Sequence, residues 1–452
     1  MNTKIKSPLC LISGALLLAA CSEEEVVNIS DSESNPIKFR TSLPTLTSRA
    51  QIVTIDNLPH FRVTAFNPAD ADLVSPEGLM NEYISKELIT NTGGQELLTS
   101  EKCLWPIPGK DGNMAFFAFY PDLNDGAELV NATKLNGNEL AIDYKLTGFR
   151  VASDIADQQD FITAYATGSM EKNLFSGITL NFGHQLSRIE LQAWGANKSC
   201  DIEIAGVRIG GVGVEGTFAF RPIEGGGQWT GDHVKGTVEY IYRKGDKIIS
   251  LDSTSGSPLT AEAAVSIMGS KVDEEENCAM LLPATYIGWD FLGDGKNDQK
   301  RMYLSVLLRV VDATPTDGKG QQRYPFTQDS DGSEASVIPT IYLAVDKASG
   351  TVSSRVYKNN NTYFTDEAFT SPYTLAGDEE VKEFGWAALP VTGEWEPGYV
   401  YTYTLDYTSG VGLHDPESPE AGNPIISDKV GVSISVKDWQ TKPSSGVVVP
   451  GS

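Results

Sequence analysis

The sequence predicts an all-β protein, because apolar and polar residues alternate along much of the chain and glycine and proline repeatedly end that alternation. Alternation with a period of two places one face of a strand against a core. The 43 glycines and 23 prolines are enough to separate many short strands, and no amphipathic helix longer than about three turns is evident. A chain of β-sandwiches is therefore the expected architecture. The alternation is clearest in six runs of residues: 37–43, 178–182, 189–193, 302–310, 399–407 and 432–436.

The N-terminus has the three parts of a secretory signal peptide. Lys4 and Lys6 make a basic start, Leu9–Ala20 is apolar, and Cys21 follows two small residues. The apolar run is shorter than the roughly 20 residues that a membrane-spanning helix needs. We therefore expect a lipoprotein signal peptide over residues 1–20, with Cys21 acylated by lipid such as palmitate. An ordinary secretory signal that ends beside a cysteine is the alternative.

Residues 21–35 are polar and begin with the acidic run Ser22–Glu25, which predicts a flexible tether. An acidic run at this position resembles the surface-export signal of Bacteroidetes lipoproteins. We therefore expect the protein to be lipid-anchored in the cell outer membrane and exposed at the cell surface. Retention in the periplasm is the alternative.

The charge of the chain excludes one class of partner. The formal net charge is −25, and removal of the two lysines of the signal peptide brings it to about −27 (−25 minus 2). Such an excess repels phosphate backbones, so nucleic-acid binding is not expected. The 40% hydrophobic content is that of a globular chain.

Three cysteines remain after processing and acylation, namely Cys103, Cys200 and Cys278. They are widely spaced and none is part of a CxxC pair, so they cannot form a disulfide framework. Buried free thiols are the simpler interpretation, although the oxidising envelope permits one bridge.

The chain is expected to divide near residues 221–229, where a strand-like run ends in Pro222–Gly227. Glycine and proline in such a cluster are typical of a linker. This predicts an N-terminal β-sandwich domain over residues 36–221 and a C-terminal one over residues 228–452.

Several segments, in order along the chain, resemble the fimbrillin family of Bacteroidetes, the Mfa-like or FimA-like lipoprotein subunits of donor-strand-assembled pili. Each motif is weak alone, but together they span nearly the whole mature chain and follow a lipoprotein signal. The segments that carry the resemblance are Lys38–Leu43 with Thr47–Ala50, Leu104–Pro106, Met114–Pro121, Asp160–Ala164, Leu180–Ile189, Val207–Phe218, Trp395–Tyr399 and Val436–Trp439.

The resemblance implies two tandem β-sandwich domains of transthyretin-like character. It also implies that a trypsin-like protease cuts after an arginine, removes the first strand and opens a groove that a neighbouring subunit fills. Carried onto this sequence, the processing site is Arg49 and Ala50, because Arg40 lies inside the strand pattern. The partners would be other fimbrial subunits, joined head to tail, and a host or bacterial surface receptor.

The resemblance also implies a donor strand near the C-terminus. The candidate residues are Val432, Ile434 and Val436, and the short run Val447, Val448 and Val449. For residues 432–436 a second interpretation is equally open, since this run can simply complete the sheet of its own domain.

No motif predicts catalysis, a cofactor or a metal site. Gly211–Gly216 fits the G-x-G-x-x-G pattern, but β-type residues follow instead of a helix, so we expect a glycine-rich turn between strands. The four histidines are far apart, and His184 is expected to pack or hydrogen-bond within its strand. Acidic loops near Asp290 and Asp329 do not match a calcium ladder. A non-enzymatic fimbrial subunit is the favoured interpretation, and a surface glycan-binding lipoprotein is the alternative.

The tyrosines at alternate positions of residues 399–407 admit two interpretations. An exposed aromatic row would suit stacking against sugars, whereas a buried row would form one face of a sheet. Aromatic residues with a period of two are more typical of a buried or half-buried sheet face.

Overall fold

Strands dominate the structure. The computed structural model describes residues 35–42, 58–91, 97–107, 110–123, 126–195, 200–252, 258–269, 277–312, 322–325, 339–426 and 430–438. Within these ranges α1 (Met170–Asn173) is one helical turn, and none of the helices is long and apolar enough to cross a membrane. The predicted all-β class is confirmed, and each of the six predicted runs coincides with a strand. The short 3₁₀ turns are η1 (Ala71–Leu73), η2 (Ile155–Asp157), η3 (Glu224–Gly226), η4 (Ala261–Ala263) and η5 (Gly293–Gly295).

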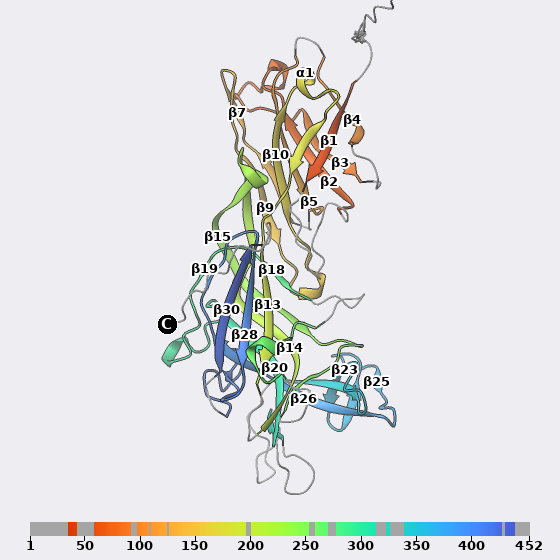
Figure 1. Ribbon diagram of the computed structural model, residues 1–452, viewed down its shortest axis with the longest axis vertical. Helices are drawn as coiled ribbons and strands as arrows, with labels where there is room; N and C mark the ends of the chain where they lie inside the picture. Colours follow the sequence, from red (N-terminus) through yellow and green to blue (C-terminus); the bar gives the residue numbers. More distant parts are fainter. Residues whose placement is uncertain are drawn as a thin grey trace, which may run out of the picture. The chain divides into compact units, whose positions relative to one another are not determined.

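Four of the sheets in the described part of the chain contain three or more strands (Figure 1). The first has the order β11 (Ile178–Asn181), β1 (Pro36–Ser42), β4 (Leu98–Leu104). The second has the order β12 (Gly183–His184), β10 (Ile162–Gly168), β5 (Met114–Tyr120), β2 (His60–Phe66), β3 (Ile84–Thr90). The third has the order β17 (Val265–Ser266), β13 (Ser187–Trp194), β28 (Tyr399–Asp406), β30 (Gly431–Asp438), with β18 (Ala279–Leu281) also on β13.

The fourth sheet is the largest. Its order is β25 (Pro372–Tyr373), β24 (Thr362–Phe364), β23 (Val352–Asn359), β22 (Thr340–Asp346), β26 (Glu379–Pro390), β20 (Tyr303–Asp312), β14 (Cys200–Phe220), β9 (Tyr144–Arg150), β6 (Glu128–Asn131). Off this path lie β15 (Gly227–Ile241) and β16 (Ile249–Leu251) on β14, β21 (Gln322–Tyr324) on β20, and β29 (Leu413–His414) on β26. Two further sheets have two strands each: β19 (Thr285–Tyr286) pairs with β27 (Gly393–Glu394), and β7 (Lys134–Asn136) pairs with β8 (Glu139–Ala141).

The first and second sheets share one apolar core, to which β1 contributes Ile37 and Phe39. The strand β5 explains how the second sheet is covered on both faces. Its residues Met114 and Phe116 belong to this core, whereas Phe117 and Phe119 belong to a second core with Phe66, Tyr144 and Phe220. A strand buried on both faces needs a nearly continuous apolar sequence, which is what MAFFAFY provides.

A third core lies along the third sheet and the largest one. Its members include Tyr401 and Tyr403 of β28, which are 6% and 1% exposed. The interpretation of the tyrosine row as a buried sheet face is therefore confirmed, and a sugar-stacking platform at this place is excluded. His184 also behaves as expected, because its Nδ1 lies 2.7 Å from Asp160 Oδ2 in a fully buried pair.

The expected linker occupies the turn of a hairpin. Phe220 and Gly227 are register partners at the end of the antiparallel pair β14 and β15, and residues 221–226 join them. In addition, β13 pairs with β28, and β14 pairs with β20 as well as β9. The described residues from Asn35 onward fall into one compact unit. The position of the boundary between two sandwich domains stays a prediction.

The expected glycine-rich turn at Gly211–Gly216 is wrong, because these residues lie inside the long strand β14. The glycines serve close packing and β-bulges instead of a reversal. A Cβ on Gly210 would lie 2.1 Å from the ring of Tyr303, and Gly211 has a φ of +67° at a register shift. The alternation of the sequence is interrupted at a bulge in the same way as at a turn, which explains the error.

Replacing Gly211 by alanine is expected to lower the free energy of unfolding by about 2–5 kcal/mol. Left-handed backbone costs an alanine about 1–2 kcal/mol, and the new Cβ would lie 2.1 Å from the carbonyl oxygen of Arg301. The matched control is Gly231→Ala, at a φ of +73° with no atom within 4 Å of the new Cβ. Urea unfolding should show a clearly larger loss at Gly211, and equal losses would refute the packing role.

Candidate assembly site

The first strand, β1, lies in the middle of its sheet. It runs parallel to β11, with Phe39 opposite Ile178, and antiparallel to β4, with Phe39 also opposite Leu98. Both edges of β1 are therefore paired, and Figure 1 shows the strand within its layer. Removing β1 would leave two neighbouring strands that are too far apart to pair with each other, because adjacent strands lie about 4.8 Å apart.

Further hydrogen bonds hold the two ends of β1. At its start, the amide of Trp105 donates to the carbonyl of Asn35 at 2.9 Å. At its end, the amide of Phe182 donates to the carbonyl of Ser42 at 2.8 Å, and Ser42 Oγ donates to Asn181 Oδ1 at 2.5 Å. These contacts fix the register of β1 between its neighbours.

The inward side chains of β1 fill an aromatic pocket. Ile37 and Phe39 are fully buried. The ring of Phe39 meets Phe61 and Phe116 edge to face, with centroids 6.1 and 6.0 Å apart. Such pairs add to the apolar area that the ring removes from water. The first strand is thus part of the core and does not lie on its surface.

Other predicted site residues lie outside the part of the chain that the structure describes. These are Cys21, Arg49 and Ala50, and the run Val447, Val448 and Val449. Their roles stay predictions. The expected cleavage site lies in the segment between β1 and β2, residues 43–59.

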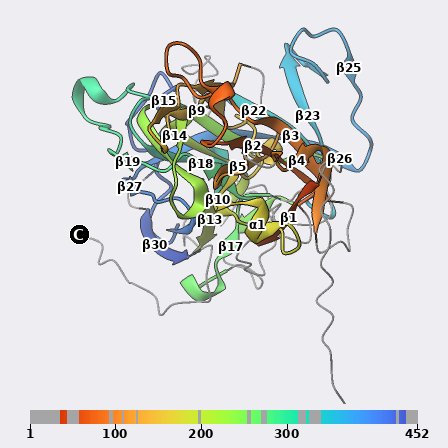
Figure 2. The ribbon, with the colours of Figure 1, turned by 90° about the horizontal axis from the view of Figure 1, so that it is seen from above.

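The second donor candidate forms β30, which is antiparallel to β28 over its full length. Val432, Ile434 and Val436 lie opposite Leu405, Tyr403 and Tyr401. In this structure the run therefore completes its own sheet, as one of the two interpretations has it. A donor role would require β30 to leave β28, and it stays a prediction. Figure 2 shows β30 at the margin of the protein.

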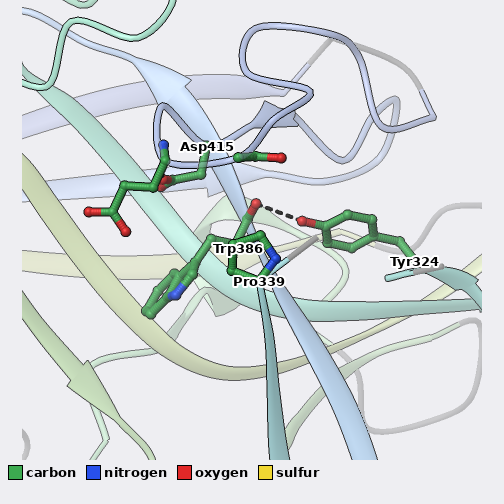
Figure 3. Close-up of a pocket in the computed structure, with 6 residues that line it drawn as sticks. Tyr324, Pro339, Trp386 and Asp415 are labelled. Carbon is green, nitrogen blue, oxygen red and sulfur yellow. Dashed lines mark hydrogen bonds between the residues drawn. The ribbon is translucent and has the colours of Figure 1, made fainter. Parts of the chain in front are cut away.

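A small cavity lined by residues between Tyr324 and Ser418 is too small for a ligand. It holds about 10 Å³, room for roughly one water molecule, and Trp386 and Asp415 line it (Figure 3). Within it the hydroxyl of Tyr324 donates to the carbonyl of Trp386 at 2.7 Å. Ligand pockets are usually tens of times larger.

Beside this cavity, the buried Arg208 is the centre of an ionic network. Its guanidinium lies over the ring of Trp386, 4.3 Å from the centroid, and binds Glu239 at 2.8 Å and Glu417 at 2.8 Å. Burial alone would lower the pKa of Arg208, but these carboxylates and Asp415 raise it. Burial raises the pKa of Asp415, which Arg208 opposes. The network connects strands far apart in sequence and has the geometry of a structural element.

Cys103, Cys200 and Cys278 are all buried, as expected, and Cys103 and Cys200 are free thiols. Burial, helped by Glu87, raises the pKa of Cys103 to about 12, and burial raises the pKa of Cys200 to about 11. Thiols with such values are protonated at neutral pH and unreactive. No group of three or more His, Cys, Asp or Glu residues in the described ranges could hold a metal ion.

A model of the fimbrillin-like family matches residues 48–306, which is more than half of the chain. The chain belongs to the fimbrillin-like family. Membership associates this fimbrillin-like protein with fimbriae and with a structural role. The resemblance inferred from the sequence is therefore confirmed. No curated protein matches the sequence.

Several solved structures are similar to this fimbrillin-like chain at low sequence identity. A candidate cell adhesion protein from Bacteroides ovatus is 12% identical, with a TM-score of 0.37 over 91% of this chain and 99% of its own. Another from Parabacteroides distasonis is 11% identical, with a TM-score of 0.38 over 89% and 100%. The fimbrial anchor protein Mfa2 from Porphyromonas gingivalis is 12% identical, with a TM-score of 0.23 over 62% and 78%.

Sequence reasoning missed the residues that surround β1. The pocket of Phe39 is built by Phe61 and Phe116, and Trp105 closes the same core. Trp105 and Phe116 lie in segments that carry the family resemblance, but their common position became visible only in the fold. Clustered aromatic residues in those segments were the one signal available.

Proposed function

We propose that this chain is a structural and adhesive subunit of a cell-surface fimbria. In this proposal it is exported as a lipoprotein acylated on Cys21 and assembles by strand exchange after cleavage at Arg49. The observation that carries the proposal is the position of β1, a buried strand paired on both edges. The segment that joins it to the rest of the fold contains Arg49. Family membership supports it independently.

The physical consequence of losing β1 is a groove that only another strand can fill well. The facing edges of β4 and β11 would expose unpaired amides and carbonyls. The pockets of Ile37 and Phe39 would become solvent-accessible, at a cost of about 1.5–3 kcal/mol for each apolar side chain. An extended segment with apolar residues at alternate positions restores both the backbone ladder and the two pockets.

The C-terminal candidates have this pattern. Val447 and Val449 are two positions apart, as are Ile37 and Phe39. Val432, Ile434 and Val436 offer the same spacing. Because groove and donor are different surfaces, the contact is head to tail and generates a filament instead of a closed dimer.

Location and partners follow from the same proposal. Before cleavage the lipid on Cys21 holds the subunit at the outer membrane with its groove filled by its own β1. After cleavage the subunit joins other fimbrial subunits and presents its surface to a receptor on host or bacterial cells. The lipid therefore attaches the subunit to the membrane only before cleavage, because the cut at Arg49 separates it from the folded chain.

Brief treatment of the chain with trypsin is expected to yield a fragment that starts at Ala50 and then assembles into multimers. Arg40 should resist cleavage, because its backbone lies inside β1, opposite Thr179 of β11. The control is Arg49→Ala, which should keep the chain intact at this site and monomeric. Mass spectrometry reads the new N-terminus and gel electrophoresis without boiling reads the multimers. A cleanly cut chain that stays monomeric contradicts the strand-exchange proposal.

A further inference from the structure

The last strand has an open and unusually apolar outer edge. β30 ends its sheet, and no strand in the described ranges pairs with its outer side. Val432 and Ile434 are 38% and 43% exposed, although Leu405 and Tyr403 beside them are buried. Edge strands are usually protected by charge, proline or a bulge. Residues 431–436 have no charge and no proline, and their register with β28 has no shift.

The sequence of β30 is complementary to itself when two copies run antiparallel. With Ile434 opposite Ile434, Val432 of one copy faces Val436 of the other, and Ser433 faces Ser435. Apolar side chains therefore meet apolar side chains on one face and hydroxyls meet hydroxyls on the other. We propose that the outer edge of β30 pairs with β30 of a second copy of this chain about a two-fold axis at Ile434.

Charge complementarity selects this register. It places Lys437 of one copy opposite Gly431 of the other, and Gly431 is the register partner of Asp406 on β28. Asp406 Oδ2 lies 3.5 Å from where a Cβ on Gly431 would be. Because Gly431 has no side chain, the side chain of Lys437 can extend across it and place its ammonium beside the carboxylate of Asp406. The two-fold axis makes this ion pair twice.

The charges of Lys437 and Asp406 are both available for a new ion pair. In the part of the chain that the structure describes, neither Lys437 nor Asp406 has an ion-pair partner, and Asp406 Oδ1 accepts only the amide of Thr408 at 2.9 Å. A second copy thus supplies what the edge lacks, namely a backbone ladder, apolar contacts and two ion pairs. The pairing keeps β30 on β28 and involves neither β1 nor the lipid. It is therefore compatible with strand exchange in which residues 447–449 are the donor, and incompatible with exchange in which β30 is the donor.

Disulfide trapping tests the proposal in the full chain with Cys10 and Cys21 replaced by serine. Ile434→Cys is expected to give a disulfide-linked dimer on mild oxidation, because directly opposite Cα atoms lie about 4.5–5.5 Å apart. The matched control is Val432→Cys, whose two copies would be offset by four residues, roughly 13 Å along the strand. The native cysteines of the described ranges are buried and should not react.

Sedimentation equilibrium gives a second readout without a new cysteine. Lys437→Asp is expected to weaken the dimer about tenfold, and combining it with Asp406→Lys should restore the affinity. Linkage at position 434 with little at position 432, together with this rescue, supports the pairing. Absence of linkage at position 434, or equal linkage at positions 434 and 432, overturns the pairing. Absence of linkage is the result expected if residues 439–452 or another strand cover this edge.

Discussion

Replacing Phe39 by alanine is expected to lower the free energy of unfolding of the intact chain by about 3–5 kcal/mol. The ring is fully buried and meets Phe61 and Phe116 edge to face. Its removal leaves a cavity in a strand that is held on both edges, so the neighbours cannot close over it easily. The loss would be among the largest that a single substitution in this chain produces.

The matched control is Phe175→Ala, since Phe175 is 69% exposed and should change stability by no more than about 0.5 kcal/mol. Both variants are compared by urea unfolding at a fixed pH. The same pair also probes the proposed cleavage, because the Phe39 effect should vanish once residues 21–49 have been cut off and removed. If Phe39→Ala costs no more than Phe175→Ala, β1 does not fill the groove.

Replacing Arg208 by methionine is expected to destabilise the chain by about 3–5 kcal/mol at pH 8, because it leaves the buried carboxylate of Asp415 without compensation. The Asp415 side chain is 3% exposed, and Arg208 also stacks on Trp386. Asp415 keeps only two neutral donors, Ser305 Oγ at 2.5 Å and the amide of Glu417 at 2.9 Å. Loss of Arg208 should therefore disrupt the whole network, which joins β14 to the segment after β29.

The matched control for Arg208 is Arg150→Met, which breaks an exposed ion pair with Glu215 at 2.7 Å and should cost about 0–1 kcal/mol. The pH dependence gives a further check. Burial raises the pKa of Asp415, so the folded chain binds this proton more readily than the unfolded one. Stability that rests on the neutral form is present at low pH and is lost as pH rises.

The deficit of Arg208→Met relative to the unaltered chain should accordingly be larger at pH 8 than at pH 5, because Arg208 is the group that lowers the pKa of Asp415. Adding Asp415→Asn should recover part of the loss at pH 8, since no buried charge remains. Equal deficits at both pH values would show that lost packing on Trp386 accounts for the whole effect.

The strands were predictable because a period of two is a local property of the sequence. The runs that became β1, β20 and β28 needed only the order of apolar and polar residues. Gly211 shows the limit of this reasoning, because a bulge within β14 and a turn between strands leave the same trace in the sequence. Only the tertiary contacts, in which Gly210 packs against the ring of Tyr303 and Gly211 against the carbonyl of Arg301, distinguish the bulge from a turn.

The sequence by itself determined the all-β class, the apolar character of the first strand and the resemblance to fimbrillins. Each follows from residue type and spacing. Only the tertiary structure decided that β1 is paired on both edges, that β30 lies on β28, and that Arg208 meets Asp415. Which strands pair depends on contacts between distant residues. Those are fixed by core packing and hydrogen-bond registers that no local pattern contains.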